Sequence, residues 1–230
     1  MTRAEYRHAL KGRSCYLGLD LSSTKDLTAV VGVFPDDDGF DVLVQPFVPK
    51  ENILERSRRD RVPYDQWQHT GYYTSGGLWV PDLIATPGNV VDYEAVRQTV
   101  KDWGAEFQVK EIAFDPWNAT DLVTRLQEQD GFPCVAMRQG FSSLSAPTKS
   151  LEKAILSKTL RHDGHPVLRW NISNVSVETD PTGNLKISKK VSTERIDCVA
   201  ALVMAVSRMD ANLGLKGKEY QLLILGATRA

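Results

Sequence analysis

Three consecutive apolar and β-branched runs near the start of the chain constrain its fold more than any other feature. Residues 15–21, 27–34 and 40–48 have the composition of strands, and they are joined by a short loop and by the turn sequence PDDDG at 35–39. Connections of this length suit antiparallel neighbours. The sequence therefore predicts a three-strand antiparallel meander.

The periodicity of apolar residues changes after the turn-forming sequence TPGN at 86–89. Asp92 can cap a helix that carries Val96, Val100 and Trp103 on one face. The other predicted elements are helices at 51–59, 64–70, 119–129, 145–160 and 194–209, strands at 109–114 and 133–137, and a hairpin of 175–177 with 185–187. Strands that alternate with helices are joined by crossovers and run parallel. We therefore predict an α/β ribonuclease H-like fold, in which helices flank a mixed central sheet of the meander plus parallel strands.

The length and composition of the chain fit one domain. We expect a polar lead-in at 1–13, the ribonuclease H-like domain at 14–210 and a C-terminal tail at 211–230. The formal net charge is −1, so any nucleic-acid binding must come from a local patch. The three cysteines are far apart and no apolar run is long enough to span a bilayer. These features predict a protein of a reducing compartment without a membrane partner.

Three aspartates in apolar surroundings form the candidate site. Asp20 lies within an apolar strand, Asp115 closes a second strand, and Asp197 opens an apolar helix. Each has a structural alternative, because Asp20 can lie on a solvated face, Asp115 can cap a helix, and Asp197 can complement the positive end of its helix. Against the first alternative, Gly18 and the small residues after Asp20 leave open space for a ligand.

The chemistry of these side chains favours a hard divalent cation. Converging carboxylates repel one another unless a cation neutralises them. Oxygen donors without a convincing set of histidines and cysteines select Mg²⁺ or Mn²⁺ over zinc. Two such ions about 4 Å apart can activate water and stabilise the leaving oxygen of a phosphodiester. The sequence therefore predicts a metal-dependent nuclease that uses two divalent cations.

Four motifs resemble the large terminase subunit of tailed bacteriophages. They are GLDLSSTKDLTA at 18–29, AFDPWNA at 113–119, RQGF at 138–141 and STERID at 192–197, in the order and with the spacing of that family. The resemblance implies the nuclease domain that cuts concatemeric viral double-stranded DNA during genome packaging, in the host cell cytoplasm. It also implies that Asp20, Asp115 and Asp197 bind the metals and are catalytic.

The same resemblance implies partners that this sequence does not contain. The family's motor needs an ATPase domain with a phosphate-binding loop ending in Gly-Lys-Ser/Thr, and no such sequence occurs here. The nearest candidate, GLKGK at 214–218, lacks both the spacing and the hydroxyl residue. The implied partners are therefore duplex DNA, a separate packaging ATPase domain, the portal and the small terminase subunit.

Further polar residues near these motifs are candidates for supporting roles. The candidate DNA contacts are Arg138, Gln139, Lys149, Lys189 and Lys190, and the candidates for supporting the metal ligands are Asp26 and Asn118. Each also has a structural alternative, since loops and hairpin ends commonly carry such residues. The five tryptophans show no regular interleaving with basic residues, which indicates packing for most of them.

Three other functions share part of this pattern. A Holliday-junction resolvase or transposase of the same fold has the acids but calls for a clearer basic surface. A sugar kinase or actin-like ATPase also runs its first strand into an aspartate and small hydroxyl residues, but it duplicates the fold into two lobes. A catalytically silent domain that docks on the portal or motor is the third alternative.

Overall fold

The antiparallel meander predicted near the start of the chain is confirmed. The computed structural model describes residues 1–22, 26–51, 53–117, 120–192 and 194–216, without the side chains of 120 and 214–216. In it β1 (Ser14–Asp20), β2 (Thr28–Asp36) and β3 (Gly39–Pro49) pair in sequence. In the β1–β2 register Gly18 faces Val31 and Asp20 faces Ala29. Asp20 is therefore the last residue of β1 and forms the last pair of this strand with β2.

Parallel strands extend the meander on both sides, as a mixed sheet requires. Strand β7 (Gln108–Phe114) pairs in parallel with β1, and β8 (Cys134–Ala136) pairs in parallel with β7. On the other side β6 (Ile84–Thr86) and β9 (Leu160–His162) both pair in parallel with β3. The path through the sheet is β6-β3-β2-β1-β7-β8. Because β1 and β7 are parallel neighbours, Asp20 and Asp115 emerge from the same end of the sheet.

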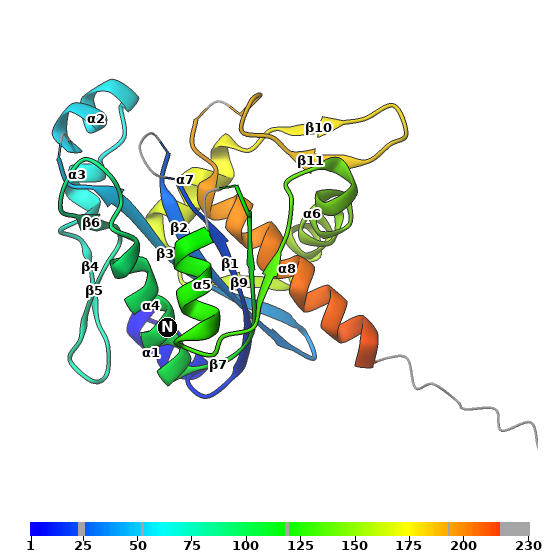
Figure 1. Cartoon of the computed structure of the whole chain (residues 1–230), viewed down its shortest axis with the longest axis horizontal. Coiled ribbons are helices and arrows are strands. Elements are labelled where there is room, and N and C mark those ends of the chain that lie inside the picture. The colour runs from blue at the N-terminus through cyan, green and yellow to red at the C-terminus, as the bar shows by residue number, and fades with distance from the viewer. Residues whose placement is uncertain (23–25, 52, 118–119, 193, 217–230) are drawn as a thin grey trace, which may run out of the picture.

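Helices cover both faces of this sheet, and each face has its own apolar core (Figure 1). The long helix α8 (Asp197–Lys216) packs on β1 and β2, with α6 (Phe141–Leu156) and α7 (Pro166–Asn174) beside it. Helices α4 (Tyr93–Glu106) and α5 (Thr120–Glu128) cover the opposite face. Side chains alternate along β1, so Tyr16 packs on the α8 side and Leu17 on the other. Asp20 therefore points to the face that α8 covers.

The segment at the start of the chain corrects one prediction. Residues 1–13 were expected to form a polar lead-in, but helix α1 (Arg3–Leu10) lies there, and it opens with a capping box between Thr2 and Glu5. Tyr6 and Leu10 are buried in the core on the α4 side. These two large apolar side chains anchor an otherwise polar helix. Two apolar positions are too few to give a helical periodicity that can be recognised in the sequence.

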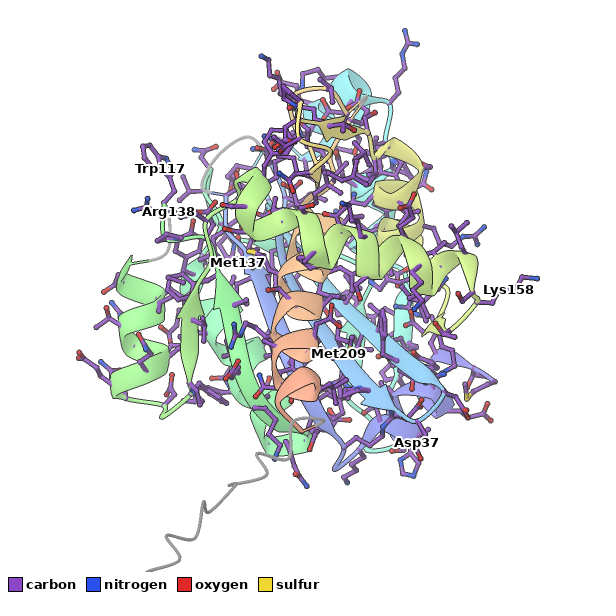
Figure 2. All side chains as sticks on the ribbon, turned by 90° about the vertical axis from the view of Figure 1, so that its right-hand side faces the viewer. Asp37, Trp117, Met137, Arg138, Lys158 and Met209 are labelled. Atoms are coloured by element: carbon purple, nitrogen blue, oxygen red, sulfur yellow. The ribbon has the colours of Figure 1, made fainter. Side chains whose placement is uncertain are left out.

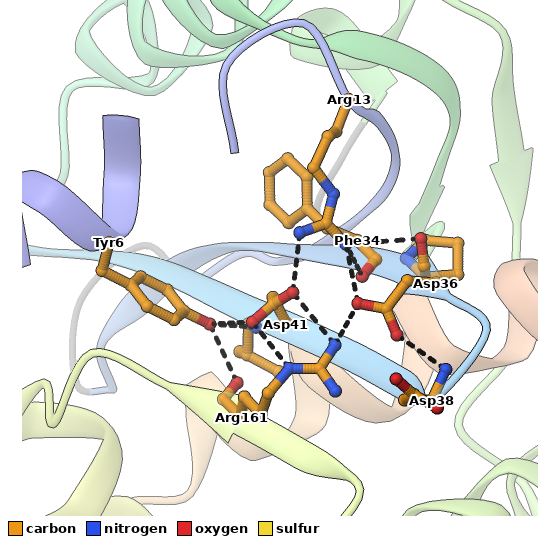
Figure 3. A network of polar contacts seen from close by, with 9 residues as sticks. Tyr6, Arg13, Phe34, Asp36, Asp38, Asp41 and Arg161 are labelled. Atoms are coloured by element: carbon orange, nitrogen blue, oxygen red, sulfur yellow. Dashed lines mark hydrogen bonds and ion pairs between the residues drawn. The ribbon is translucent and has the colours of Figure 1, made fainter. Parts of the chain in front are cut away.

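A polar network on the meander explains why α1 belongs to the domain (Figure 3). The Tyr6 hydroxyl lies 3.1 Å from Oδ1 of Asp41 and 3.0 Å from the carbonyl oxygen of Arg161, and it accepts the N–H of Val42 at 3.1 Å. Arg13 and Arg161 bind the same Asp41 carboxylate at 2.8 and 3.0 Å. The network therefore joins α1, β3 and β9 across most of the sequence.

The other predicted elements are present with shifted bounds. Asp92 caps α4 through a 2.9 Å bond from the N–H of Glu94. Helix α6 begins four residues earlier than predicted and accommodates Pro147, and α8 extends past 210 into the segment expected as a tail. The other bounds are α2 (Ile53–Asp60), α3 (Tyr64–Trp67), β4 (Gly71–Tyr73), β5 (Trp79–Pro81), β10 (Val177–Thr179) and β11 (Leu185–Ile187). Helix α7 and the short strands β4, β5, β6 and β9 were not predicted. Among the described residues no helix has the length and apolar character needed to cross a membrane.

Candidate active site

The approach of α8 to β1 determines where the site lies. A Cβ built on Gly18 would lie 1.9 Å from the carbonyl oxygen of Ala201, so only glycine lets the helix backbone lie directly on the strand. The space that the sequence seemed to reserve for a ligand beside Gly18 is thus occupied by α8, which corrects that argument. The close packing has a consequence for chemistry, because it brings the first turn of α8 beside the end of β1.

Asp20 and Asp197 meet at this junction, and Lys189 lies between them. The Lys189 ammonium is 2.6 Å from Oδ2 of Asp20 and 2.6 Å from Oδ1 of Asp197. Only 3% of Asp20 and 1% of Asp197 is exposed, whereas the Lys189 side chain remains 37% exposed. The second oxygen of Asp197 accepts the backbone N–H of Leu27 at 3.2 Å. A lysine predicted as a DNA contact is therefore a bridge between two buried carboxylates.

The electrostatics of the three groups are strongly coupled. Burial raises the pKa of Asp20 and of Asp197, and the nearby Lys189 ammonium partly offsets that rise in both. Burial by itself lowers the pKa of Lys189, but the two carboxylates reverse this effect and raise that pKa well above its ordinary value. The two carboxylates therefore favour the charged form of Lys189 in this arrangement.

Asp115 lies in the same pocket as Asp20, although it is not part of the lysine bridge. A cavity of about 140 Å³ is lined by polar groups of Asp20, Ser22, Asp26, Asp115, Gln139 and Lys189, together with Leu21 and Trp117. Oδ1 of Asp115 accepts the N–H of Trp117 at 3.1 Å in a turn that precedes α5, which begins at Thr120, so this bond is not the predicted helix cap. Gln139 lines the same pocket, and its side chain helps to lower the pKa of the Asp20 carboxyl. The turn uses one oxygen of Asp115 and leaves the other for the pocket.

The donor set of this pocket fits a hard cation, but the ligands are not preassembled. Within the described ranges, no group of three or more histidine, cysteine, aspartate or glutamate residues is arranged to hold a metal. Oδ2 of Asp20 is buried and, despite its ion-pair distance to Lys189, accepts no hydrogen bond of good geometry from the part of the chain described. A buried oxygen of this kind, in a cavity lined by further oxygens, suits a divalent ion. Asp20, Asp26 and Asp115 are the carboxylates that could hold it on the pocket side, with Asp197 across Lys189.

The other predicted residues have mixed placements. Asp26 lines the pocket and forms an ion pair with Arg195 at 3.1 Å. Lys149 donates to the carbonyl oxygen of Gly183 at 3.2 Å in the turn between β10 and β11, so it is not directed into the pocket. Lys190 and Arg138 are exposed. Asn118 lies outside the described residues.

Trp117 is a candidate functional residue that the sequence analysis missed. Its side chain is 88% exposed and yet lines the pocket beside Asp115. Figure 2 shows Trp117 and Arg138 projecting outward from the same part of the surface. An exposed indole is uncommon for a packing tryptophan. The signal in the sequence was its position two residues after a candidate catalytic aspartate.

A larger apolar groove lies elsewhere in the structure. Its volume is about 520 Å³, and it lies between α6, α7, α8 and the β10–β11 hairpin. Glu152 is the one ionisable side chain among its lining residues. The candidate site is therefore distinguished by its converging carboxylates and not by its size.

A mixed sheet with carboxylates at the ends of β1 and β7 and at the start of α8 defines the class of ribonuclease H-like nucleases. The family model for the terminase large subunit, endonuclease domain, matches residues 6–212. The chain belongs to this family. The fold prediction is confirmed, and the resolvase, transposase and kinase alternatives have no support from this match.

Curated relatives agree with the family assignment. The chain is 34% identical over 211 residues to the terminase large subunit of Enterobacteria phage HK97. The aligned region covers 90% of this chain and 40% of that protein. It is 30% identical over 210 residues to the protein YmfN of Escherichia coli K12, covering 86% and 44%. The chain thus spans less than half the length of these relatives.

Solved structures show the same fold. The crystal structure of the HK97 large terminase matches with a TM-score of 0.74 and 32% identity, over 90% of this chain and 43% of that one. The magnesium-bound large terminase nuclease of the thermophilic phage G20c matches with a TM-score of 0.54 and 10% identity, over 86% and 84%. The second likeness supports the fold alone, because its sequence identity is low.

Proposed function

We propose that this chain is a metal-dependent endonuclease that hydrolyses phosphodiester bonds of concatemeric viral double-stranded DNA during genome packaging. The observation that carries the proposal is the convergence of Asp20 and Asp115 in one polar pocket, with Asp197 joined to Asp20 through Lys189. The family assignment supports the reaction class. The G20c nuclease solved with magnesium supports a divalent ion in this fold.

The residues have separate roles in this proposal. Asp20, Asp115 and Asp197 hold two divalent cations, Mg²⁺ or Mn²⁺, with Asp26 at the edge of the pocket. When bound, these ions supply an activated water and stabilise the leaving oxygen. Gln139 lines the pocket with Asp20 and favours the charged form of that carboxylate. Burial of Asp20 and Asp197 keeps bulk water away from both carboxylates, which strengthens their interaction with positive charge.

Duplex DNA would lie across the rim formed by Trp117 and Arg138. Both side chains are exposed beside the pocket, and Lys190 adds a positive charge next to Lys189. With a net charge of −1 the chain has few phosphate contacts to offer. Such contacts give salt-dependent affinity without sequence preference. We therefore propose weak, nonspecific binding by this chain alone.

The proposed partners rest on the family assignment. The HK97 protein is more than twice as long as the region matched here. We propose that a packaging ATPase domain, the portal and the small terminase subunit complete the motor in the host cytoplasm. Tethering to that motor would raise the effective DNA concentration at the pocket.

A plasmid-cutting assay tests the proposed reaction. Supercoiled plasmid is incubated with the protein in Mg²⁺, Mn²⁺, Ca²⁺ or EDTA. Mg²⁺ and Mn²⁺ should support nicking and linearisation, whereas Ca²⁺ should not, because its looser coordination positions the attacking water poorly. Cutting that persists in EDTA would contradict the metal-dependent mechanism. Binding of DNA without cutting under every condition would favour the silent docking domain.

A further inference from the structure

The position of Lys189 sets a condition on how the pocket can bind metal. Its ammonium is 2.6 Å from one oxygen of Asp20 and 2.6 Å from one oxygen of Asp197. A divalent ion shared by the same two carboxylates would need the same space, because its oxygen ligands lie at about 2.0–2.1 Å for Mg²⁺. The ammonium and such an ion therefore exclude one another.

Hydrogen bonds of the backbone and of nearby serine hydroxyls hold Lys189 in this position. The carbonyl oxygen of Ser188 accepts the N–H of Ser192 at 3.1 Å and its hydroxyl at 2.7 Å, which closes a turn around Lys189. The hydroxyl of Ser192 in turn accepts the N–H of Ser176 at 3.0 Å, and Ser188 donates its N–H to the carbonyl oxygen of Ser176. The turn is thus fixed to the start of the β10–β11 hairpin. Only the flexible stem of Lys189 needs to move for its ammonium to leave.

The two sides of Asp20 differ in this respect. On the pocket side Asp20 faces Asp115, whose Oδ1 is engaged by a backbone N–H and not by a cation. On the other side the pair with Asp197 already holds a positive charge. Lys189 also lines this pocket, so an ion between Asp20 and Asp115 would lie beside the ammonium, whereas an ion between Asp20 and Asp197 must replace it.

We propose that Lys189 is a built-in counter-ion that competes with a divalent cation for the Asp20–Asp197 pair. The inference rests on the proposed function, since it takes these carboxylates to be metal ligands. An ion shared by Asp20 and Asp197 would bind only when the ammonium leaves the pair. A DNA phosphate beside the pocket supplies the anion to which the released ammonium turns. Lys189 thereby couples complete metal loading to the presence of substrate.

Calorimetric titration with Mn²⁺ tests this competition. The proteins compared are the wild type, Lys189→Met and the matched control Lys190→Met, which removes the same charge from the next residue. If the ammonium occupies the pair nine-tenths of the time, its removal tightens binding of the second ion by about tenfold. We expect that gain for Lys189→Met and a much smaller one for Lys190→Met.

The outcomes separate the inference from the proposed function. Equal Mn²⁺ affinities for the two variants would overturn the competition while leaving a metal-binding nuclease. Absence of Mn²⁺ binding in all three proteins would overturn the proposed function together with the inference. A thermal melt of Lys189→Met should show a lower midpoint than the wild type without metal, and a larger gain on addition of Mn²⁺, because the two buried carboxylates have then lost their counter-ion.

Lysine labelling of the wild type keeps the inference testable if Lys189→Met does not fold. Reductive methylation followed by mass spectrometry reports how accessible each ammonium is. Without metal, Lys189 should react several-fold more slowly than Lys190, and saturating Mn²⁺ without DNA should remove most of that difference. Unchanged protection of Lys189 in saturating Mn²⁺ would show that its ammonium does not leave the pair.

Discussion

Gly18 of β1 lies directly against the backbone of Ala201 in α8, and an added methyl group would be 1.9 Å from the Ala201 carbonyl oxygen. This contact fixes the distance between the strand that carries Asp20 and the helix that begins at Asp197. A backbone atom cannot turn aside as a flexible side chain can. The position of the candidate site therefore depends on one glycine that carries no chemistry.

Substitution of this glycine should damage both stability and activity. For Gly18→Ala we expect a loss of about 1–3 kcal/mol or more in the free energy of unfolding, because overpacking of a closed core costs that much. Plasmid cutting should fall further than stability alone explains, since α8 carries Asp197 with it. Urea unfolding and the nicking assay measure the two effects. Gly76→Ala is the control, as the nearest atom to its added methyl group is 3.9 Å away; a fully active Gly18→Ala protein would refute the argument.

Removal of the Asp115 charge should abolish cutting and leave the fold intact. Asn can still accept the N–H of Trp117, so Asp115→Asn should melt at the temperature of the wild type. We expect cutting to fall by at least about 100-fold, because a metal ligand supplies several kcal/mol of transition-state stabilisation. Asp121→Asn, at a side chain that is 81% exposed, is the matched control. Wild-type rates for Asp115→Asn would remove this residue from the site.

Loss of the exposed indole should weaken DNA binding without affecting stability. Because Trp117 is 88% exposed, Trp117→Ala should not change the melting temperature. We expect the Kd for random-sequence duplex to rise by about tenfold, equivalent to about 1.4 kcal/mol. Fluorescence anisotropy at fixed salt measures this change. Trp79→Ala, on the β4–β5 hairpin, controls for the loss of an aromatic side chain, and equal affinities for the two variants would argue against the proposed rim.

Acid should weaken the junction between α1 and the sheet. Burial opposes ionisation of Asp41, but Arg161 and Arg13 outweigh it and hold the pKa of this carboxyl below its ordinary value of about 4. A lowered folded-state pKa stabilises the protein above the unfolded-state value, and this contribution disappears as the pH falls through the folded-state pKa. Stability should therefore drop below about pH 4.

Asp41→Asn is the variant that checks this assignment. At pH 7 it should lose about 1–2 kcal/mol, less than a fully buried pair, because Arg13 and Arg161 are about one-third exposed. Below pH 4 the difference from the wild type should shrink. Urea unfolding at several pH values measures both quantities, with the exposed Asp37→Asn as the control. A difference that stays constant with pH would contradict the role of Asp41.

The sequence by itself determined most of the sheet and indicated the carboxylates of the candidate site. Strand composition and short turns are local properties, so the meander at 15–48 was predictable, as were the capped helix after Asp92 and the parallel strands that follow. An aspartate in an apolar strand is also a local property of the sequence, and the free-energy cost of burying its charge pointed to Asp20. Helix α1 was missed because two buried side chains, Tyr6 and Leu10, hold it to a distant part of the chain.

Only the tertiary structure decided how the candidate site is assembled. Gly18 seemed to leave room for a ligand, but it makes room for α8. Lys189 was predicted as a DNA contact, and its ammonium joins Asp20 to Asp197. Gly18 and Ala201 are more than a hundred positions apart in the sequence, and so are Lys189 and Asp20. Lys189 and Asp197 are eight positions apart. Burial and approach distance depend on which elements pack together, and no local pattern of residue types encodes that choice.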